Sequence, residues 1–337
     1  MANLEIIDRQ ILTARKGEIR FITLKVAKLN FILRPMSNIM LQRFKEATFR
    51  GAFGKVFRRL VCAFPHQEKC QECLLFKKCV FSIIFSPGAT EGDNFLKKFE
   101  SVPRPFTIQI KNTKDIISTE DELKVQFVLI GKAMEYYPYV FLTIKELGNE
   151  GFGIRNKEGI RGKYEIKEVI EILPDGTERN IFNCKNPNAW LPLKGFHLKD
   201  VIEEAEVKAC EIKFETPVRL KQNGRIVQFI DFRLLIRSII TRFNALSYFY
   251  GNHLPEIDIK KLLDEAEKVN VNKCSTEFVD FNWHSSHQKT HIMLGGLIGK
   301  MGYRGNISPF YPYLKIAEVI GVGKNTTFGF GRIKVQI

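Results

Sequence analysis

Long apolar runs are missing from this chain. No uninterrupted apolar stretch reaches the roughly 18 residues that a membrane-spanning helix needs. The N-terminal residues MANLEIIDRQ carry acidic side chains and have no apolar core of the kind that a secretory signal peptide contains. We therefore expect a cytoplasmic protein with no membrane partner.

Acidic residues are scarce at both ends of the chain. Lys and Arg number 52 against 37 Asp and Glu, which gives a formal net charge of +15 at pH 7. Between Arg9 and Arg59 the acidic residues are Glu18 and Glu46, and the segment from His284 onward is similarly basic. A basic face can simply be solvated, but two basic ends favour a polyanionic partner whose phosphates supply affinity. The charge favours a nucleic acid over a small metabolite, without separating RNA from DNA or a membrane surface.

The C-terminal half predicts the element order β-α-β-β-α-β. Its first strand alternates apolar residues at Cys210, Ile212 and Phe214 with charged ones. The helix over 232–250 has apolar residues at helical spacing, and Gly251 suits the left-handed position that follows a helix. A short extra helix follows over 258–269, and two strands follow over 279–283 and 291–298. A helix over 308–321 and a last strand over 328–337 complete this half. This is the order of a ferredoxin-like split β-α-β unit.

The N-terminal half predicts the same order less cleanly. A strand over 21–33, whose alternation slips near Val26, is followed by a helix over 39–63. Strands are expected over 80–85 and 123–130, with an extra edge strand over 103–110 between them. A helix over 133–147 and a strand over 164–172 complete this half. Glycine-rich connections follow the second helix of each half, at Gly148–Gly153 and from Gly321, which indicates an internal duplication. The predicted fold class is α+β, with tandem ferredoxin-like (RRM-like, βαββαβ) domains.

The predicted domain limits follow from this duplication. An N-terminal ferredoxin-like domain with a cysteine-cluster insertion is expected over 1–175 and a linker over 176–205, because the stretch Pro174–Pro192 looks like a connection. A C-terminal ferredoxin-like domain is expected over 206–337.

A glycine-rich loop lies between the last predicted helix and the last strand. Its glycines are Gly321, Gly323, Gly329 and Gly331. A dinucleotide fingerprint needs a strand followed by a helix, and a P-loop is excluded because Asn325 follows Lys324. A flexible turn is the alternative. Glycines nevertheless let main-chain N–H groups approach phosphates, Lys324 and Arg332 add charge, and Phe328 or Phe330 could stack on a base. We therefore predict a loop that binds RNA.

Four of the seven cysteines lie in one segment, at Cys62, Cys70, Cys73 and Cys79, with His66 between the first two. A cytoplasmic setting disfavours disulfides. The spacing is compatible with a four-thiolate structural zinc site, and the alternative is that reduced cysteines pack as small hydrophobic side chains.

The order of several segments resembles a known family. They are Arg50–Gly54 in the first helix, the cysteine cluster, Phe214–Leu220, Gly295–Gly299 and the closing glycine-rich loop. Together they are similar, over nearly the whole chain, to the CRISPR-associated repeat-processing endoribonucleases of the repeat-associated mysterious protein superfamily. The resemblance implies tandem ferredoxin-like domains that bind CRISPR repeat RNA. It also implies cleavage without a metal or other catalytic cofactor, which leaves a 2′,3′-cyclic phosphate and a 5′-hydroxyl.

Such a cleavage requires groups that move protons, and histidine suits that task. In many relatives a catalytic histidine lies on or just after the first helix, but 39–63 contains none, so His66 is the first candidate. His284, His287 and Lys289 form a second cluster, where relatives tend to carry an Arg-Tyr-Ser-x-Arg-Gln type of run. These residues are either an acid–base group or replacements for RNA contacts. Catalysis by positioning and Lys or Arg alone also stays open.

Further RNA contacts are expected from basic residues outside the loop, namely Arg50, Arg58, Arg155 and Arg161. The implied partners are CRISPR repeat RNA and subunits of a CRISPR effector complex, with the protein a monomer or a homodimer. The alternative function is a non-catalytic RNA-binding subunit of such a complex.

Overall fold

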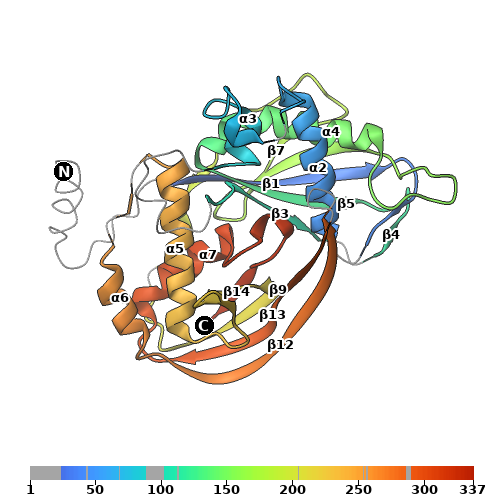
Figure 1. Cartoon of the computed structure of the whole chain (residues 1–337). Coiled ribbons are helices and arrows are strands. Elements are labelled where there is room, and N and C mark those ends of the chain that lie inside the picture. The colour runs from blue at the N-terminus through green and yellow to red at the C-terminus, as the bar shows by residue number, and fades with distance from the viewer. Residues whose placement is uncertain are drawn as a thin grey trace. The chain divides into compact units, whose positions relative to one another are not determined.

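The chain forms two compact units in this computed structural model. The described residues are 24–42, 45–67, 69–88, 102–111, 114–203, 205–252, 254–255, 257–285 and 290–337 (Figure 1). The N-terminal unit contains Lys25–His197 together with Asn325–Gly329. The C-terminal unit contains Leu24, Leu198–Lys324 and Phe330–Ile337.

The N-terminal unit has the predicted β-α-β-β-α-β order. The elements are β1 (Lys25–Pro35), α2 (Lys45–Val61), β3 (Phe106–Ile110), β5 (Leu123–Ile130), α4 (Tyr137–Glu150) and β6 (Tyr164–Ile172), with the short 3-10 helix η3 (Gly131–Tyr136) leading into α4. The strands pair antiparallel in the order β3-β5-β1-β6. Two further strands, β7 (Glu178–Asn183) and β8 (Phe196–His197), pair with β6 and β1. A small separate sheet is formed by β2 (Ile39–Met40) and β4 (Ile116–Ile117).

The C-terminal unit repeats this arrangement. Its elements are β9 (Ala209–Val218), α5 (Phe232–Tyr250), α6 (Ile259–Ala266), β12 (Asn270–Ser285), β13 (Thr290–Arg304), α7 (Tyr311–Ile320) and β14 (Ile333–Gln336). The strand order β12-β13-β9-β14 is equivalent to that of the first unit. The short strands β10 (Lys221–Gln222) and β11 (Arg225–Ile226) form a hairpin. The predicted fold class, two ferredoxin-like α+β units, is confirmed.

Aromatic side chains on one face of α2 form much of the N-terminal core. Phe49, Phe53 and Phe57 recur every fourth position, are fully buried and face the sheet, where the Phe53 ring lies 5.4 Å from that of Phe127. Gly54 has a packing role, because a Cβ there would lie 2.1 Å from the Phe85 ring. Gly54 therefore admits an aromatic ring against the helix.

One predicted strand was wrong. Residues 80–85 form the short helix α3 (Val80–Ile84), and the second strand of the fold is β3, which the sequence suggested as an extra edge strand. Val, Phe and Ile favour strands in isolation, but the Phe81 ring packs 5.8 Å from Phe57, so tertiary packing outweighs local preference. The prediction of a linker over 176–205 also differs from the structure, because β7 and β8 lie there. Buried Glu171 holds this region by accepting hydrogen bonds from Arg179 and from the backbone of Lys194 and Gly195.

Other differences concern limits and single residues. The pairing of β1 shifts between Ile32 and Leu33 rather than near Val26, and the predicted residues 21–23 lie outside the described residues. Gly251 has an extended φ of −94°. It is needed instead because a Cβ would lie 2.6 Å from the Ser247 carbonyl oxygen. The last strand begins at Ile333 rather than 328. No helix in the described part of the chain could cross a membrane.

Candidate functional site

The glycine-rich loop has a backbone that glycine alone adopts readily. Its glycines Gly321, Gly323, Gly329 and Gly331 have φ values of 77°, 75°, 83° and 77°. Backbone hydrogen bonds hold the loop: Val322 N–H donates to Gly331 O within it at 2.8 Å, and Lys324 N–H donates to Arg219 O outside it at 3.0 Å. The loop is therefore a fixed structure rather than a flexible turn.

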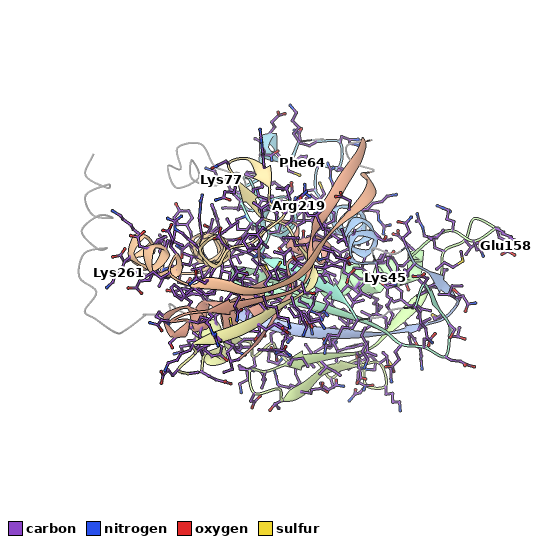
Figure 2. The ribbon with its side chains drawn as sticks, turned by 90° about the horizontal axis from the view of Figure 1, so that it is seen from below. Lys45, Phe64, Lys77, Glu158, Arg219 and Lys261 are labelled. Carbon is purple, nitrogen blue, oxygen red and sulfur yellow. The ribbon has the colours of Figure 1, made fainter. Side chains whose placement is uncertain are left out.

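The glycines allow close approach of the protein's own backbone. A Cβ on Gly331 would lie 2.0 Å from Val322 O, and one on Gly323 would lie 2.5 Å from Arg219 O. The N–H groups of Gly329 and Gly331 already donate to Thr326 O and Pro217 O. The expectation that these N–H groups cradle a phosphate is thus not supported at Gly329 and Gly331, because both are used within the fold. Arg219, labelled in Figure 2, also donates to Gly295 O at 2.8 Å.

The tip of the loop, Asn325–Gly329, groups with the N-terminal unit. It contains the short 3-10 helix η6 (Thr326–Phe328), which contacts α2 and β3. Arg50 of α2 donates from Nε to Thr327 Oγ1 at 3.2 Å, and its guanidinium lies 4.1 Å from the Phe328 ring centre. The same guanidinium lies 4.6 Å from the Phe85 ring centre. Arg50 therefore connects α2 to the loop tip.

The environment of Arg50 is largely apolar. Burial, and to a lesser degree the neighbouring Arg104 guanidinium, lower the pKa of Arg50 to about 9. The side chain still carries its charge at neutral pH, where the faces of Phe85 and Phe328 attract it. Phe328 is half-buried by this contact, and Phe330 is 3% exposed, so Phe330 cannot stack on a base. Sequence reasoning missed Thr327 and Phe85, since nothing local links them to Arg50.

We expect Arg50→Ala to destabilise the N-terminal unit by about 1–3 kcal/mol, because it removes a hydrogen bond and two cation–π contacts. Urea unfolding followed by tryptophan fluorescence measures the loss, and Arg50→Lys should recover part of it. Arg59→Ala on the same helix is the control, because Arg59 pairs with Glu150 at an exposed position and its removal should cost at most about 1 kcal/mol. Equal losses for the two alanine variants would contradict the bridging role of Arg50.

The other predicted RNA-binding arginines have partners of their own. Arg332 pairs with Glu215, and its N–H donates to Thr216 Oγ1. Arg58 donates to the Gln67 carbonyl oxygen after α2, and Arg155 donates to Gly159 O. Arg58 and Arg155 support local turns, and Arg332 connects the end of the loop to β9. RNA contact by Arg58, Arg155 and Arg332 stays a prediction.

The counterpart loop at 148–153 differs from its prediction. Gly148 lies within α4, and Gly151, with a φ of 91°, ends that helix. Arg161 is exposed beside this turn, and a Cβ added to Gly151 would lie 2.9 Å from the Cβ of Arg161. The first loop is therefore shorter than expected, and Arg161 stays a predicted RNA contact.

The predicted histidines belong to different units. In the C-terminal unit β12 and β13 run side by side as two long, curved strands (Figure 1), and His284 is paired in register with His291. His287 and Lys289 lie outside the described residues. His66 is in the N-terminal unit, exposed in the segment after α2.

The four cysteines of the segment after α2 are not arranged as a metal-binding site. Among the described residues, which include all four cysteines, no three or more His, Cys, Asp or Glu side chains are arranged to hold a metal ion. Cys70 and Cys79 pack against the N-terminal core, and burial raises the pKa of the Cys70 thiol. These contacts favour the alternative in which thiols act as small hydrophobic side chains. Zinc at Cys62, Cys70, Cys73 and Cys79 stays a prediction, to be checked by measuring the metal content of the purified protein before and after Cys73→Ser.

The two units match different family models. Residues 212–333 match the family of the CRISPR-associated endoribonuclease Cas6, and residues 24–191 match a family described as an N-terminal domain. A CRISPR-associated endoribonuclease Cas6 from Streptococcus thermophilus is 24% identical over 200 residues, which cover 52% of this chain and 78% of that protein. An uncharacterized protein from Archaeoglobus fulgidus is 22% identical over 305 residues, which cover 86% of this chain and 90% of that one.

Solved structures share the fold. Thermus thermophilus Cas6 superposes with a TM-score of 0.53 at 12% identity, covering 93% of this chain and 99% of that chain. At this identity the likeness shows the fold, and the match of residues 212–333 supplies the family relationship. The match of residues 212–333, the Streptococcus thermophilus relative and the shared fold together support a CRISPR repeat-processing family that includes the Cas6 endoribonucleases.

Proposed function

We propose that this protein is an endoribonuclease that binds and cleaves CRISPR repeat RNA without a metal ion. The observation that carries the proposal is the match of residues 212–333 to the Cas6 endoribonuclease family, on a unit whose ferredoxin-like topology is complete. The net charge of +15 supports a polyanionic substrate.

The proposed reaction uses the RNA's own 2′-hydroxyl as nucleophile. A base on the protein takes the 2′-hydroxyl proton, the 2′ oxygen bonds to phosphorus, and the bond to the 5′ oxygen breaks as an acid donates a proton to it. The products are a 2′,3′-cyclic phosphate and a 5′-hydroxyl. We assign the proton transfers to His284 and His287 and the charge stabilisation to Lys289. His66 is the second candidate for proton transfer.

Incubation of the protein with its repeat RNA in EDTA tests the proposal. We expect cleavage at one position with EDTA present, and no cleavage when the nucleotide before the cut carries a 2′-deoxy substitution. The untreated RNA with magnesium serves as the control for activity. Loss of cleavage in EDTA, or cleavage of the 2′-deoxy substrate, would contradict the mechanism.

One observation favours a second function, a non-catalytic RNA-binding subunit of a CRISPR effector complex. Helix α2, over Lys45–Val61, contains no histidine, although relatives tend to place their catalytic histidine on or just after this helix. A subunit of this kind would bind repeat RNA and leave it intact under every condition above.

The oligomeric state is a separate question. Light scattering of the free and RNA-bound protein would distinguish a monomer from a homodimer.

A further inference from the structure

The segment that follows α2 encloses a cavity of about 370 Å³ in the N-terminal unit. Residues 63–67 and 72–74 line it. Two large apolar side chains in its wall are open to solvent, Phe64 at 47% and Leu74 at 94% exposure. Exposed apolar surface gathered around a cavity is typical of a binding site.

The backbone around the cavity is held in place. Gln67 N–H donates to Phe64 O at 3.0 Å, and Arg58 donates to Gln67 O from the last turn of α2. On the opposite side, Cys73 N–H donates to Cys70 O at 3.1 Å within a short 3-10 turn. The cavity is therefore formed before any ligand binds, so little ordering entropy opposes binding.

The lining residues include one charged side chain, Glu72, but the segment that carries the cavity is basic. Between Lys55 and Lys78 the sequence has six Lys or Arg residues, and its acidic residues are Glu68 and Glu72. Glu72 is paired with Lys69 at 2.9 Å. Exposed Lys77 and Lys78 follow Leu74 by three and four residues, and Figure 2 labels Lys77 on the same side of the ribbon as Phe64.

We propose that this cavity binds one unstacked base of the RNA, with the Phe64 ring as its stacking surface. The inference rests on the proposed function, because it takes RNA as the ligand. Lys77 and Lys78 contact the neighbouring phosphates, and the His66 imidazole faces the edge of the base, whereas the Gln67 amide donates to Lys69 O at 3.2 Å. Stacking on an aromatic ring is the usual way in which proteins hold a single-stranded base.

Size and charge favour a base over a protein partner. The volume lies near the lower end of the roughly 300–1,000 Å³ typical of small-ligand sites, which suits one ring system. Lysines beside an aromatic ring complement a phosphate backbone, whereas an apolar protein surface would leave them without counter-charges.

Variants of Phe64 test the stacking. We expect Phe64→Ala and Phe64→Leu to weaken binding of the repeat RNA by about 5- to 150-fold, and Phe64→Trp to retain it, because stacking needs an aromatic ring. Phe229→Ala removes a ring that is 51% exposed in the C-terminal unit and is the matched control, expected to bind as the wild type does. Full affinity in Phe64→Leu would overturn the proposal in favour of an apolar contact with a protein.

Repeat RNAs with a single abasic nucleotide identify the base. We expect one abasic position to weaken wild-type binding by a similar factor and to cause no further loss in Phe64→Ala. Losses that add at every position would overturn the proposal. If wild-type protein does not bind repeat RNA at all, the proposed function fails. If it binds and Phe64→Ala binds equally, the role of the cavity alone is wrong.

Discussion

Replacing His284 or His287 with alanine is expected to lower the cleavage rate of repeat RNA by about 10²–10⁴-fold while RNA affinity changes little. The physical reason is that a group that moves a proton in the transition state contributes to the rate and hardly to ground-state binding. His284 is the second-last residue of β12, and its paired residue in β13 is His291. Single-turnover cleavage and a separate binding measurement with 2′-deoxy RNA give the two quantities.

His66→Ala is the matched comparison for these variants. It removes an exposed histidine from the N-terminal unit. We expect weaker RNA binding, with a single-turnover cleavage rate at saturating protein that stays within a few-fold of the wild type. A large loss of cleavage in His66→Ala alone would move the acid–base group to the segment after α2. A parallel fall of affinity and rate in the His284 and His287 variants would assign these residues to RNA contact instead.

Gly331→Ala is expected to destabilise the C-terminal unit by about 2–5 kcal/mol. A left-handed backbone costs an alanine roughly 1–2 kcal/mol, and overlap with fixed atoms adds about 1–3 kcal/mol. The overlap is severe here, because the new Cβ would lie 2.0 Å from Val322 O, which belongs to the backbone. A lower midpoint of urea unfolding measures the loss.

Gly159→Ala separates strain from overlap. Gly159 has a φ of 78°, almost that of Gly331, but a Cβ there meets nothing within 4 Å. We expect a loss of about 1–2 kcal/mol. Equal decreases in the free energy of unfolding for the two variants would show that the loop backbone moves to accommodate a Cβ at position 331. Unchanged stability with weakened RNA binding in Gly331→Ala would instead indicate a direct contact between this part of the loop and RNA.

Periodicity predicted most elements of both units. The strands over 123–130 and 164–172 have the limits that the sequence suggested, and α5 covers the predicted helix over 232–250. Alternating and helical spacing of apolar residues shows which face of a strand or helix is buried, so these elements can be predicted without the tertiary structure. The helix α3 was read as a strand because a short apolar run is compatible with both states, and contact with Phe57 decides between them.

The candidate site was predicted less well. The sequence identified the glycine-rich loop and Arg50 as important, but it assigned both to direct contact with RNA. The structure shows Arg50 bound to Thr327 and the N–H groups of Gly329 and Gly331 donating to carbonyl groups. Thr327 lies far from Arg50 in the sequence, and Pro217 lies far from Gly331, so composition does not record which donor meets which acceptor.

By itself, the sequence determined that the chain is basic, forms two ferredoxin-like units and resembles the repeat-processing family. These properties depend on charge totals, spacing and the order of motifs, which need no three-dimensional information. Tertiary structure alone decided that the glycines serve close backbone approach, that Arg50 connects α2 to the loop tip, and that a cavity opens beside Phe64. Each of these depends on which groups meet across the fold, because hydrogen bonds and packing act over a few ångströms between residues that can be hundreds of positions apart.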